Sequence, residues 1–404
     1  MDLTRRGIIG AGLGAGALVV SPWEAGAQDA EIRIGSLCPI TRAGSPFGPG
    51  MQKGIEYAVA DVNAAGGVLG GRKLRLFSED SQSDPDAAIR AAKKLIDVNG
   101  VQTLLGTWSS SVTMAIAPIA MQNKIVNMNT SSTTDLRSMK KDEYVWQCLG
   151  STITYGKMMG EYAVQQGYKK AAFLAFNNPS GITLGDEFKK RFEAAGGTCT
   201  VTVYNANQTS YKAELARALS TKPDVIALGS YLPDTTILLK EWYALGETTR
   251  WVGPNWAVSP ALLQAVGPDA AEGIVSIGAL ARSDTPAYEA FRARFERDMK
   301  QNVLDNPFGA VGYDMGIVCA LAIEAAKSPV AEEFRRQIRA VTGPEGRKVY
   351  LVKDALEAIR AGERINYEGV SGSMDFDETG ETRPDFAYWV AEKGKLQLKE
   401  RLPA

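Results

Sequence analysis

The chain has 404 residues, and its 45 lysines and arginines balance 46 aspartates and glutamates, so that the formal net charge is −1. Because basic and acidic residues are interspersed, the sequence lacks the basic surface that binds a phosphate backbone, and we expect no nucleic-acid partner. It contains no histidine, which excludes His-containing catalytic triads and His-ligated metal sites. Four cysteines without a C-x-x-C pair form no zinc or redox motif. We therefore expect neither a metal nor a cofactor.

The first 27 residues have the pattern of an export signal. Arg5 and Arg6 precede an apolar run at 8–20, and small residues at 25–27 fit cleavage after Ala27. The run of about 13 residues is shorter than the roughly 20 that span a bilayer. Residues 4–9 resemble the twin-arginine motif, with an ordinary secretory signal as the alternative. Both routes predict a periplasmic protein.

From residue 31 onward, short apolar runs alternate with amphipathic stretches, which is the pattern of βα units on a parallel sheet. We expect strands near 32–37, 73–77, 101–105 and 125–128, with helices near 51–62, 85–96 and 110–122. Asp84-Pro85 is a typical helix start, and Gly66-Gly67 is a typical helix stop. These elements form a first doubly wound half.

A second series of the same kind follows. Its expected strands lie near 171–176, 200–204, 225–228, 251–252 and 274–277, between helices near 155–166, 183–195, 211–220, 234–245 and 259–266. After Gly278 we expect helices near 286–303, 311–327, 330–340 and 353–361, and strands near 370–376 and 386–391. The sequence thus predicts two α/β lobes, each with a doubly wound parallel sheet.

Hydroxyl-rich loops follow two neighbouring strands of the first half. Ligands of open α/β sheets bind at the carboxyl ends of the strands, and there Trp108, Ser109 and Ser110 lead directly into a helix. Serines beside the unpaired N–H groups of a helix start can hold a carboxylate or an amide oxygen; the alternative is that one serine merely caps the helix. Ser131 and Thr133 follow the next strand. The two loops together favour a binding site.

Aromatic residues occupy equivalent positions in both halves. Trp108 and Tyr155 follow strands of the first series, and Tyr231 and Trp256 follow strands of the second. Each of these rings alone is commonly a core residue. Their position at strand ends favours contact with a ligand.

Several motifs in this order resemble the type I periplasmic solute-binding proteins of ABC transporters for branched-chain amino acids, amides and urea. They cover essentially the whole mature chain. The motifs are Glu-Ile-Arg-Ile-Gly at 31–35, Gly-x-Gly-x-x-x-Gly at 48–54, the segments 61–68, 80–85 and 106–111, Tyr313-Asp314, and Gly-Val-Ser-Gly-Ser-Met-Asp-Phe-Asp at 369–377 with Gly380.

The resemblance implies two lobes joined by a three-segment hinge, with lobe 1 at 28–148 and 279–366 and lobe 2 at 149–278 and 367–404. It also implies that the lobes close on a small-molecule ligand and then dock to inner-membrane ABC permease subunits. We expect a monomer without enzymatic activity.

The resemblance also assigns roles to individual residues. The family's carboxylate-binding loop falls on Ser109 and Ser110, its second polar loop on 131–133, and its second-lobe tyrosine on Tyr231. Asn255 stands where the amino-acid binders have an acid that pairs with the ligand's ammonium group. An ammonium group would therefore lack its usual partner here, unless Asp314 takes over that role. A buried ammonium group without a counter-charge is costly.

Three ligand classes therefore remain open from the sequence: an amino acid, a neutral amide or urea, and a carboxylate with an aromatic body stacked on Trp108 or Trp256. Trp108 resembles the urea and amide branch of the family.

Two other functions are alternatives to a transport receptor. A periplasmic enzyme is disfavoured because the sequence has no G-x-S-x-G or H-E-x-x-H motif. A ligand sensor for a signalling partner would have the same fold and cleft.

Overall fold

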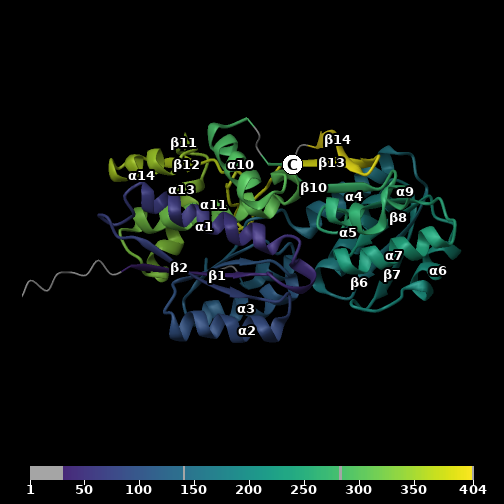
Figure 1. Ribbon diagram of the computed structural model, residues 1–404, viewed down its shortest axis with the longest axis horizontal. Coiled ribbons are helices and arrows are strands. Elements are labelled where there is room, and N and C mark those ends of the chain that lie inside the picture. Colours follow the sequence, from purple (N-terminus) through teal and green to yellow (C-terminus); the bar gives the residue numbers. More distant parts are fainter. Residues whose placement is uncertain (1–30, 140–141, 282–283, 403–404) are drawn as a thin grey trace, which may run out of the picture.

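The chain folds into two α/β lobes that lie side by side along the long axis of the molecule (Figure 1). The computed structural model describes residues 31–139, 142–281 and 284–402. The export signal expected at 1–27 lies outside the described residues. Each lobe has a mostly parallel sheet with helices on both faces, so the predicted fold class is confirmed.

In the first lobe, described strands pair in parallel in the order β2-β1-β3-β4-β5. Side chains alternate across the sheet, so Ile34 of β1 faces the core under α1, whereas Leu37 faces the core under α2 and α3. Asp84 caps α2 as expected, since its Oδ1 accepts the Ala87 N–H at 2.9 Å. The elements are β1 (Ile32–Cys38), α1 (Gly48–Ala64), β2 (Leu74–Asp80), α2 (Pro85–Lys93), β3 (Thr103–Thr107), α3 (Ser110–Gln122), β4 (Val126–Asn129) and β5 (Val145–Gln147).

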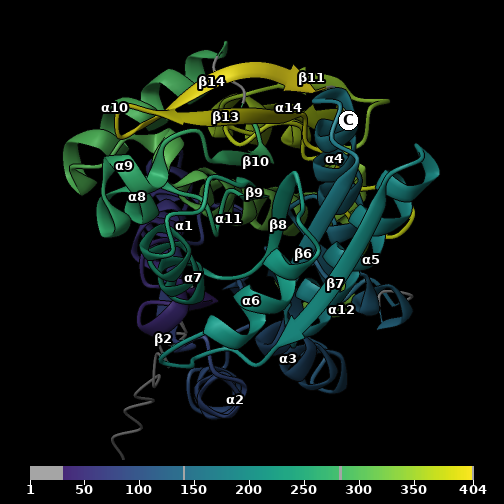
Figure 2. The ribbon, with the colours of Figure 1, turned by 90° about the vertical axis from the view of Figure 1, so that its right-hand side faces the viewer.

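The sheet of the second lobe has the order β14-β13-β10-β9-β8-β6-β7. Its first five strands in the chain are parallel, and the C-terminal hairpin β13–β14 adds antiparallel to β10, where Figure 2 shows it crossing the edge of the lobe. The elements are α4 (Thr152–Gln165), β6 (Lys170–Phe176), α5 (Pro179–Ala194), β7 (Thr198–Tyr204), α6 (Lys212–Ser220), β8 (Val225–Gly229), α7 (Leu232–Ala244), β9 (Arg250–Pro254), α8 (Pro260–Val266), α9 (Pro268–Ala271), β10 (Val275–Ala279), β13 (Phe386–Glu392) and β14 (Lys395–Leu402).

Between β10 and β13 the chain returns to the first lobe, where α11 packs along α1. α11 is apolar enough to span a membrane, but 89% of its most apolar stretch is buried inside the protein, as in a core helix. The chain therefore passes between the two sheets three times, at 148–151, after β10 and at 368–385. The returning elements are α10 (Pro286–Met299), α11 (Pro307–Ala326), α12 (Ala331–Phe334), α13 (Ile338–Thr342), β11 (Arg347–Val349), α14 (Val352–Arg360) and β12 (Ile365–Tyr367).

Some predicted elements were wrong. No strand forms at 370–376, where the described backbone makes only the isolated bridges Glu368–Ser373 and Phe376–Thr382. The N–H groups of Val370 and Ser371 bond instead to a buried carboxylate described below. The helix expected at 330–340 is broken into short pieces, and the helix expected at 286–303 ends at Met299 because Lys300 is left-handed, with φ 54°. The short strands β5, β11, β12 and β14 were missed.

Glycines let α1 and α11 approach closely, and Gly54 of the Gly-x-Gly-x-x-x-Gly motif is one of them. A Cβ atom at Gly54 would fall on the carbonyl oxygen of Gly309, and one at Gly312 would fall on that of Met51. Backbone atoms cannot move aside as a flexible side chain can. The first lobe therefore depends on small residues at this helix crossing.

Replacing Gly54 with leucine should lower the free energy of unfolding by about 3 kcal/mol, the upper part of the range for overpacked cores. Ala60→Leu on the exposed face of the same helix is the matched control, and it should change stability by less than about 0.5 kcal/mol. Urea unfolding of both variants checks this. Equal stability of the two would show that the crossing is not tightly packed.

Candidate ligand-binding site

A small cavity lies between the two lobes, at the carboxyl ends of strands from both sheets. Its volume is about 10 Å³, room for one water molecule. First-lobe residues come after β3 and β4, and second-lobe residues come after β8 and β9 and from the start of α5. We call it the inner cavity, and its lining residues are Trp108, Ser110, Thr130, Ser132, Leu149, Ser180, Tyr231, Trp256 and Phe308.

The start of α3 faces this cavity without a side-chain cap. Ser109 is the N-cap residue, with extended backbone, yet its hydroxyl makes no capping hydrogen bond. The N–H groups of the first helical turn have no partner within the helix. Ser110 lines the cavity, and its Oγ accepts a hydrogen bond from Ser131 Oγ at 3.2 Å. A hydroxyl pair and unpaired N–H groups thus stand together at the positive end of a helix.

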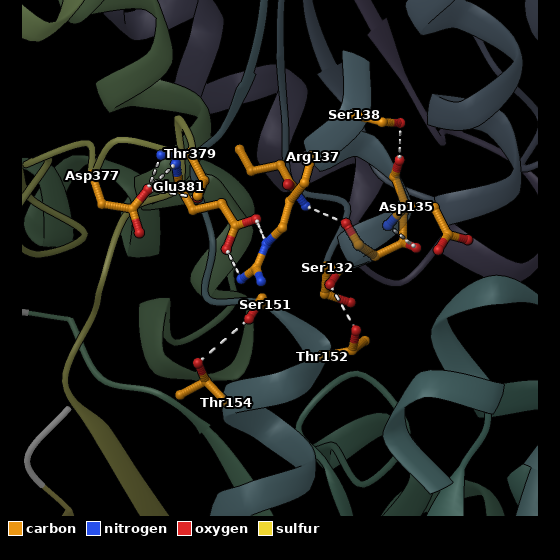
Figure 3. Close-up of polar contacts among 12 residues, drawn as sticks. Ser132, Asp135, Arg137, Ser138, Ser151, Thr152, Thr154, Asp377, Thr379 and Glu381 are labelled. Atoms are coloured by element: carbon orange, nitrogen blue, oxygen red, sulfur yellow. Dashed lines mark hydrogen bonds and ion pairs between the residues drawn. The ribbon is translucent and has the colours of Figure 1, made fainter. Parts of the chain in front are cut away.

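The loop after β4 is fixed by buried hydrogen bonds. Gln147 Nε2 donates to the carbonyls of Ser131 (2.7 Å) and Thr133 (3.0 Å). Thr152 Oγ1 of α4 donates to the Ser132 carbonyl at 2.9 Å, as Figure 3 shows. Thr133 does not line the cavity, and its Oγ1 accepts the Asp135 N–H instead. Ser131 donates a hydrogen bond to Ser110. Ser132 lines the cavity, whereas the sequence predicts ligand contacts for its neighbours Ser131 and Thr133.

Side chains of the two lobes touch directly across the cavity. Tyr231 Oη lies 3.5 Å from Ser109 Oγ, and Ser132 Oγ lies 3.2 Å from Ser180 Oγ. The Tyr231 ring packs between Trp108 and Phe176 with both pairs tilted, and its centroid lies 4.7 and 4.5 Å from theirs. Burial raises the pKa of Tyr231, opposed by hydrogen bonds that include one from the backbone N–H of Ser110. Tyr231 therefore occupies the start of α3 in this closed arrangement.

Tyr231 also separates the inner cavity from a larger outer cavity of about 360 Å³. The outer cavity contains Ser109 and Ser111 from the first lobe and Asn178 from the second. Tyr231 lines both cavities and therefore lies between them.

Tyr155 and Trp256 form one aromatic support. Their ring centroids are 4.6 Å apart, and Tyr155 packs behind Trp256 against Phe386 of β13. Tyr155 is fully buried and its Oη accepts the Ala279 N–H at 3.3 Å, where the chain leaves the second sheet. The sequence placed Tyr155 in contact with ligand, but it lies one layer behind, and burial raises its pKa.

Asn255 lies close to the site but faces another space. Its side chain rests against Gly278, and it lines a separate cavity of about 210 Å³. Its Oδ1 has no hydrogen-bond partner among the described residues. Asn255 is therefore displaced from the inner cavity, contrary to its predicted contact with the ligand head group.

Asp314 does not line the inner cavity, although the sequence predicts a ligand contact for it. Its fully buried carboxylate accepts hydrogen bonds from Tyr367 Oη (2.8 Å), Val370 N (3.0 Å) and both the N–H and the hydroxyl of Ser371 (2.8 and 2.5 Å). These donors belong to the third passage between the lobes. Burial raises the pKa of Asp314 to about 6, and the hydrogen bonds oppose this shift. Asp314 anchors the hinge to α11.

The sequence missed five lining residues: Thr130, Ser132, Leu149, Ser180 and Phe308. Thr130 and Ser132 belong to a hydroxyl run that the sequence did identify, but Ser180 and Phe308 come from the starts of α5 and α11. No local pattern connects those helices with β3.

Comparison with known proteins places this geometry in a family. Residues 31–392 match the model of the family described as periplasmic binding protein. The chain is 24% identical over 376 residues to Leu/Ile/Val-binding protein homolog 1 of Brucella abortus, covering 91% of this chain and 92% of the relative.

Solved structures agree on the fold. A leucine-binding protein from Thermotoga maritima superposes with a TM-score of 0.79 at 22% identity, covering 92% of this chain and 99% of the other. A solute-binding protein of an R. palustris ABC transporter, in complex with benzoate, gives a TM-score of 0.77 at 21% identity, with 93% and 97% covered. The chain therefore belongs to the family of periplasmic binding proteins.

Asp314 should make stability depend on pH. Its pKa of about 6 exceeds its ordinary value of 3.8, so the folded protein binds the proton more tightly and the contribution of Asp314 to the free energy of unfolding falls as pH rises from about 4 to 6. The difference in stability between wild type and Asp314→Asn should therefore shrink over that range, as measured by urea unfolding.

Asp224 is the matched control, because the N–H groups of Lys169 and Lys170 lower its pKa. Its contribution is lost only as pH falls below about 4, so Asp224→Asn should differ from wild type by a constant amount between pH 4.5 and 7. Equal pH profiles for the two variants would refute the assignment to Asp314.

Proposed function

We propose that this protein is the solute-binding component of an ABC importer, which captures a small solute between its lobes and delivers it to the inner-membrane permease. The observation that carries the proposal is the inner cavity, where the uncapped start of α3 meets Ser180, Tyr231 and Trp256 of the opposite lobe. A solute held there contacts both lobes at once. Its binding energy then favours the closed form, which the permease reads.

The lobes are proposed to divide at 28–148 with 279–366, and at 149–278 with 367–404. Support comes from sheet membership, because β1–β5 share one sheet and β6–β10 with β13 and β14 share the other. The three passages between the sheets would act as the hinge. Export with cleavage after Ala27 and a monomeric state complete the proposal.

Binding without chemistry is proposed for this site. Ser110 Oγ, the most central hydroxyl, is hydrogen-bonded to another hydroxyl and not to a base. A serine nucleophile needs such a base for activation. A transport role accounts for the cavity without any reactive group.

The solute is proposed to be an amino acid, an amide or urea, or a related carboxylate. The Brucella relative is named as a Leu/Ile/Val-binding protein, and the R. palustris protein was crystallised with benzoate. Both kinds of solute carry a carboxylate, which the start of α3 suits.

Mature protein, residues 28–404, should show a raised melting temperature with its solute in a thermal-shift screen of amino acids, amides, urea and aromatic carboxylates. Solute at a hundred times Kd adds about 2.7 kcal/mol of stability. Ser110→Ala should then weaken binding about tenfold or more in calorimetric titration, because it removes a hydrogen bond to a charged group.

Thr113→Val is the matched control, since Thr113 is buried one turn further along α3 and does not line the inner cavity. Its affinity should equal that of the wild type, and Ser110→Ala should melt close to the wild type. Unchanged affinity in Ser110→Ala would remove α3 from the binding site.

A further inference from the structure

The inner cavity has no place for a positive charge. None of the described residues that line it is ionisable in the physiological range, since their polar side-chain groups are hydroxyls and the indoles of Trp108 and Trp256. A buried ammonium group needs a counter-charge. An α-amino acid closed into this cavity would lack that partner.

Nearby carboxylates are already engaged. Asp84 caps α2 and lies 3.3 Å from Arg42, and Asp234 accepts hydrogen bonds from Tyr211 Oη (2.7 Å) and Asn207 N (3.0 Å). The Asp314 carboxylate is held by the hinge. None of these three lines the inner cavity.

The inner cavity offers hydrogen-bond donors but no charged side chain. Trp256 Nε1 and Thr130 Oγ1 have no hydrogen-bond partner among the described residues, and both side chains are only 3% exposed. An indole N–H can only donate, so Trp256 requires an acceptor. The start of α3 adds further donors and favours negative charge over a neutral amide.

The apolar part of the wall consists mostly of aromatic rings. The rings of Trp108, Tyr231, Trp256 and Phe308 surround the cavity, together with Leu149. The Trp108 ring packs at a tilt against Tyr231 and meets Phe308 edge-on, with centroids 4.7 and 6.1 Å apart. Such walls suit a planar body that can stack between rings.

We infer that the solute is a compact organic monocarboxylate with a flat, apolar body and no ammonium group, of which benzoate is the simplest aromatic example. This rests on the proposed function and chooses among its solute classes. The solute's oxygens accept from the first turn of α3 and from Trp256, and its body lies between the rings. Tyr231 withdraws toward the outer cavity to admit it, because the inner cavity now holds about 10 Å³.

Pairs of solutes that differ by a single group test this by calorimetric titration of the mature protein. Phenylacetate should bind at least tenfold more tightly than phenylglycine, because phenylglycine adds only an ammonium group. Benzoate should bind more tightly than benzamide. An amino acid that binds as tightly as its deaminated partner would overturn the inference and leave the proposed function intact.

Absence of binding by every member of these pairs would also overturn the inference. A different solute class found by the thermal-shift screen, such as a sugar, would then preserve the proposed function. Absence of any binder in the whole screen would overturn both.

Two variants test separately the Trp256 N–H donor and the lack of a carboxylate in the inner cavity. Trp256→Phe keeps the ring and removes the N–H, so carboxylate binding should weaken about tenfold. Trp242→Phe is the control, because its Nε1 is also buried without a partner among the described residues but lies in the core of the second lobe. Equal affinities for the two variants would overturn the role of Trp256.

Thr130→Asp places a carboxylate in the inner cavity. Its affinity for phenylglycine should rise relative to that for phenylacetate by at least tenfold. An unchanged preference would show that charge at this cavity does not select the solute, and it would overturn the inference.

Discussion

The candidate binding site depends on the start of α3, which has no side-chain cap. Ser109 is placed to cap α3 but makes no capping hydrogen bond. Unpaired N–H groups buried between two lobes are costly unless something supplies an acceptor. In the closed arrangement Tyr231 of the opposite lobe takes that position. A solute with a better acceptor and comparable ring contacts would replace it.

The surrounding fold keeps this helix start in place. Gln147 fixes the loop after β4 through two carbonyls, and its backbone pairs with the third passage, at Gly380 and Thr382. Arg137 joins the same passage through both oxygens of Glu381, at 2.9 and 3.0 Å (Figure 3). The binding loop and the hinge are therefore one hydrogen-bonded unit. A change in lobe angle and a change at the solute are physically linked.

Much of this could be predicted from sequence because its signals are local. Alternating apolar runs gave the parallel sheets, and three serines at one helix start exceeded what capping requires. Tyr231 and Trp256 followed from the rule that sites lie at strand ends. The short strands β5, β11 and β12 have too few residues to show a period, and β14 is largely exposed.

Other features depend on contacts between distant parts of the chain. Ser180 and Phe308 reach the cavity from the starts of helices with no sequence pattern in common with β3. Asp314 looked like a substitute for the missing ligand acid, but the hinge backbone at 370–371 takes its oxygens, and the same bonds prevent the strand expected there. Asn255 follows the right strand, yet its side chain turns toward Gly278.

A crystal structure of the mature protein with its bound solute tests the central claim most directly. The account predicts that the solute lies between the lobes, with an acceptor oxygen within hydrogen-bonding distance of the first-turn N–H groups of α3 and with Tyr231 moved from that position. A solute bound in the cavity beside Asn255, or one without contact to α3, would contradict it.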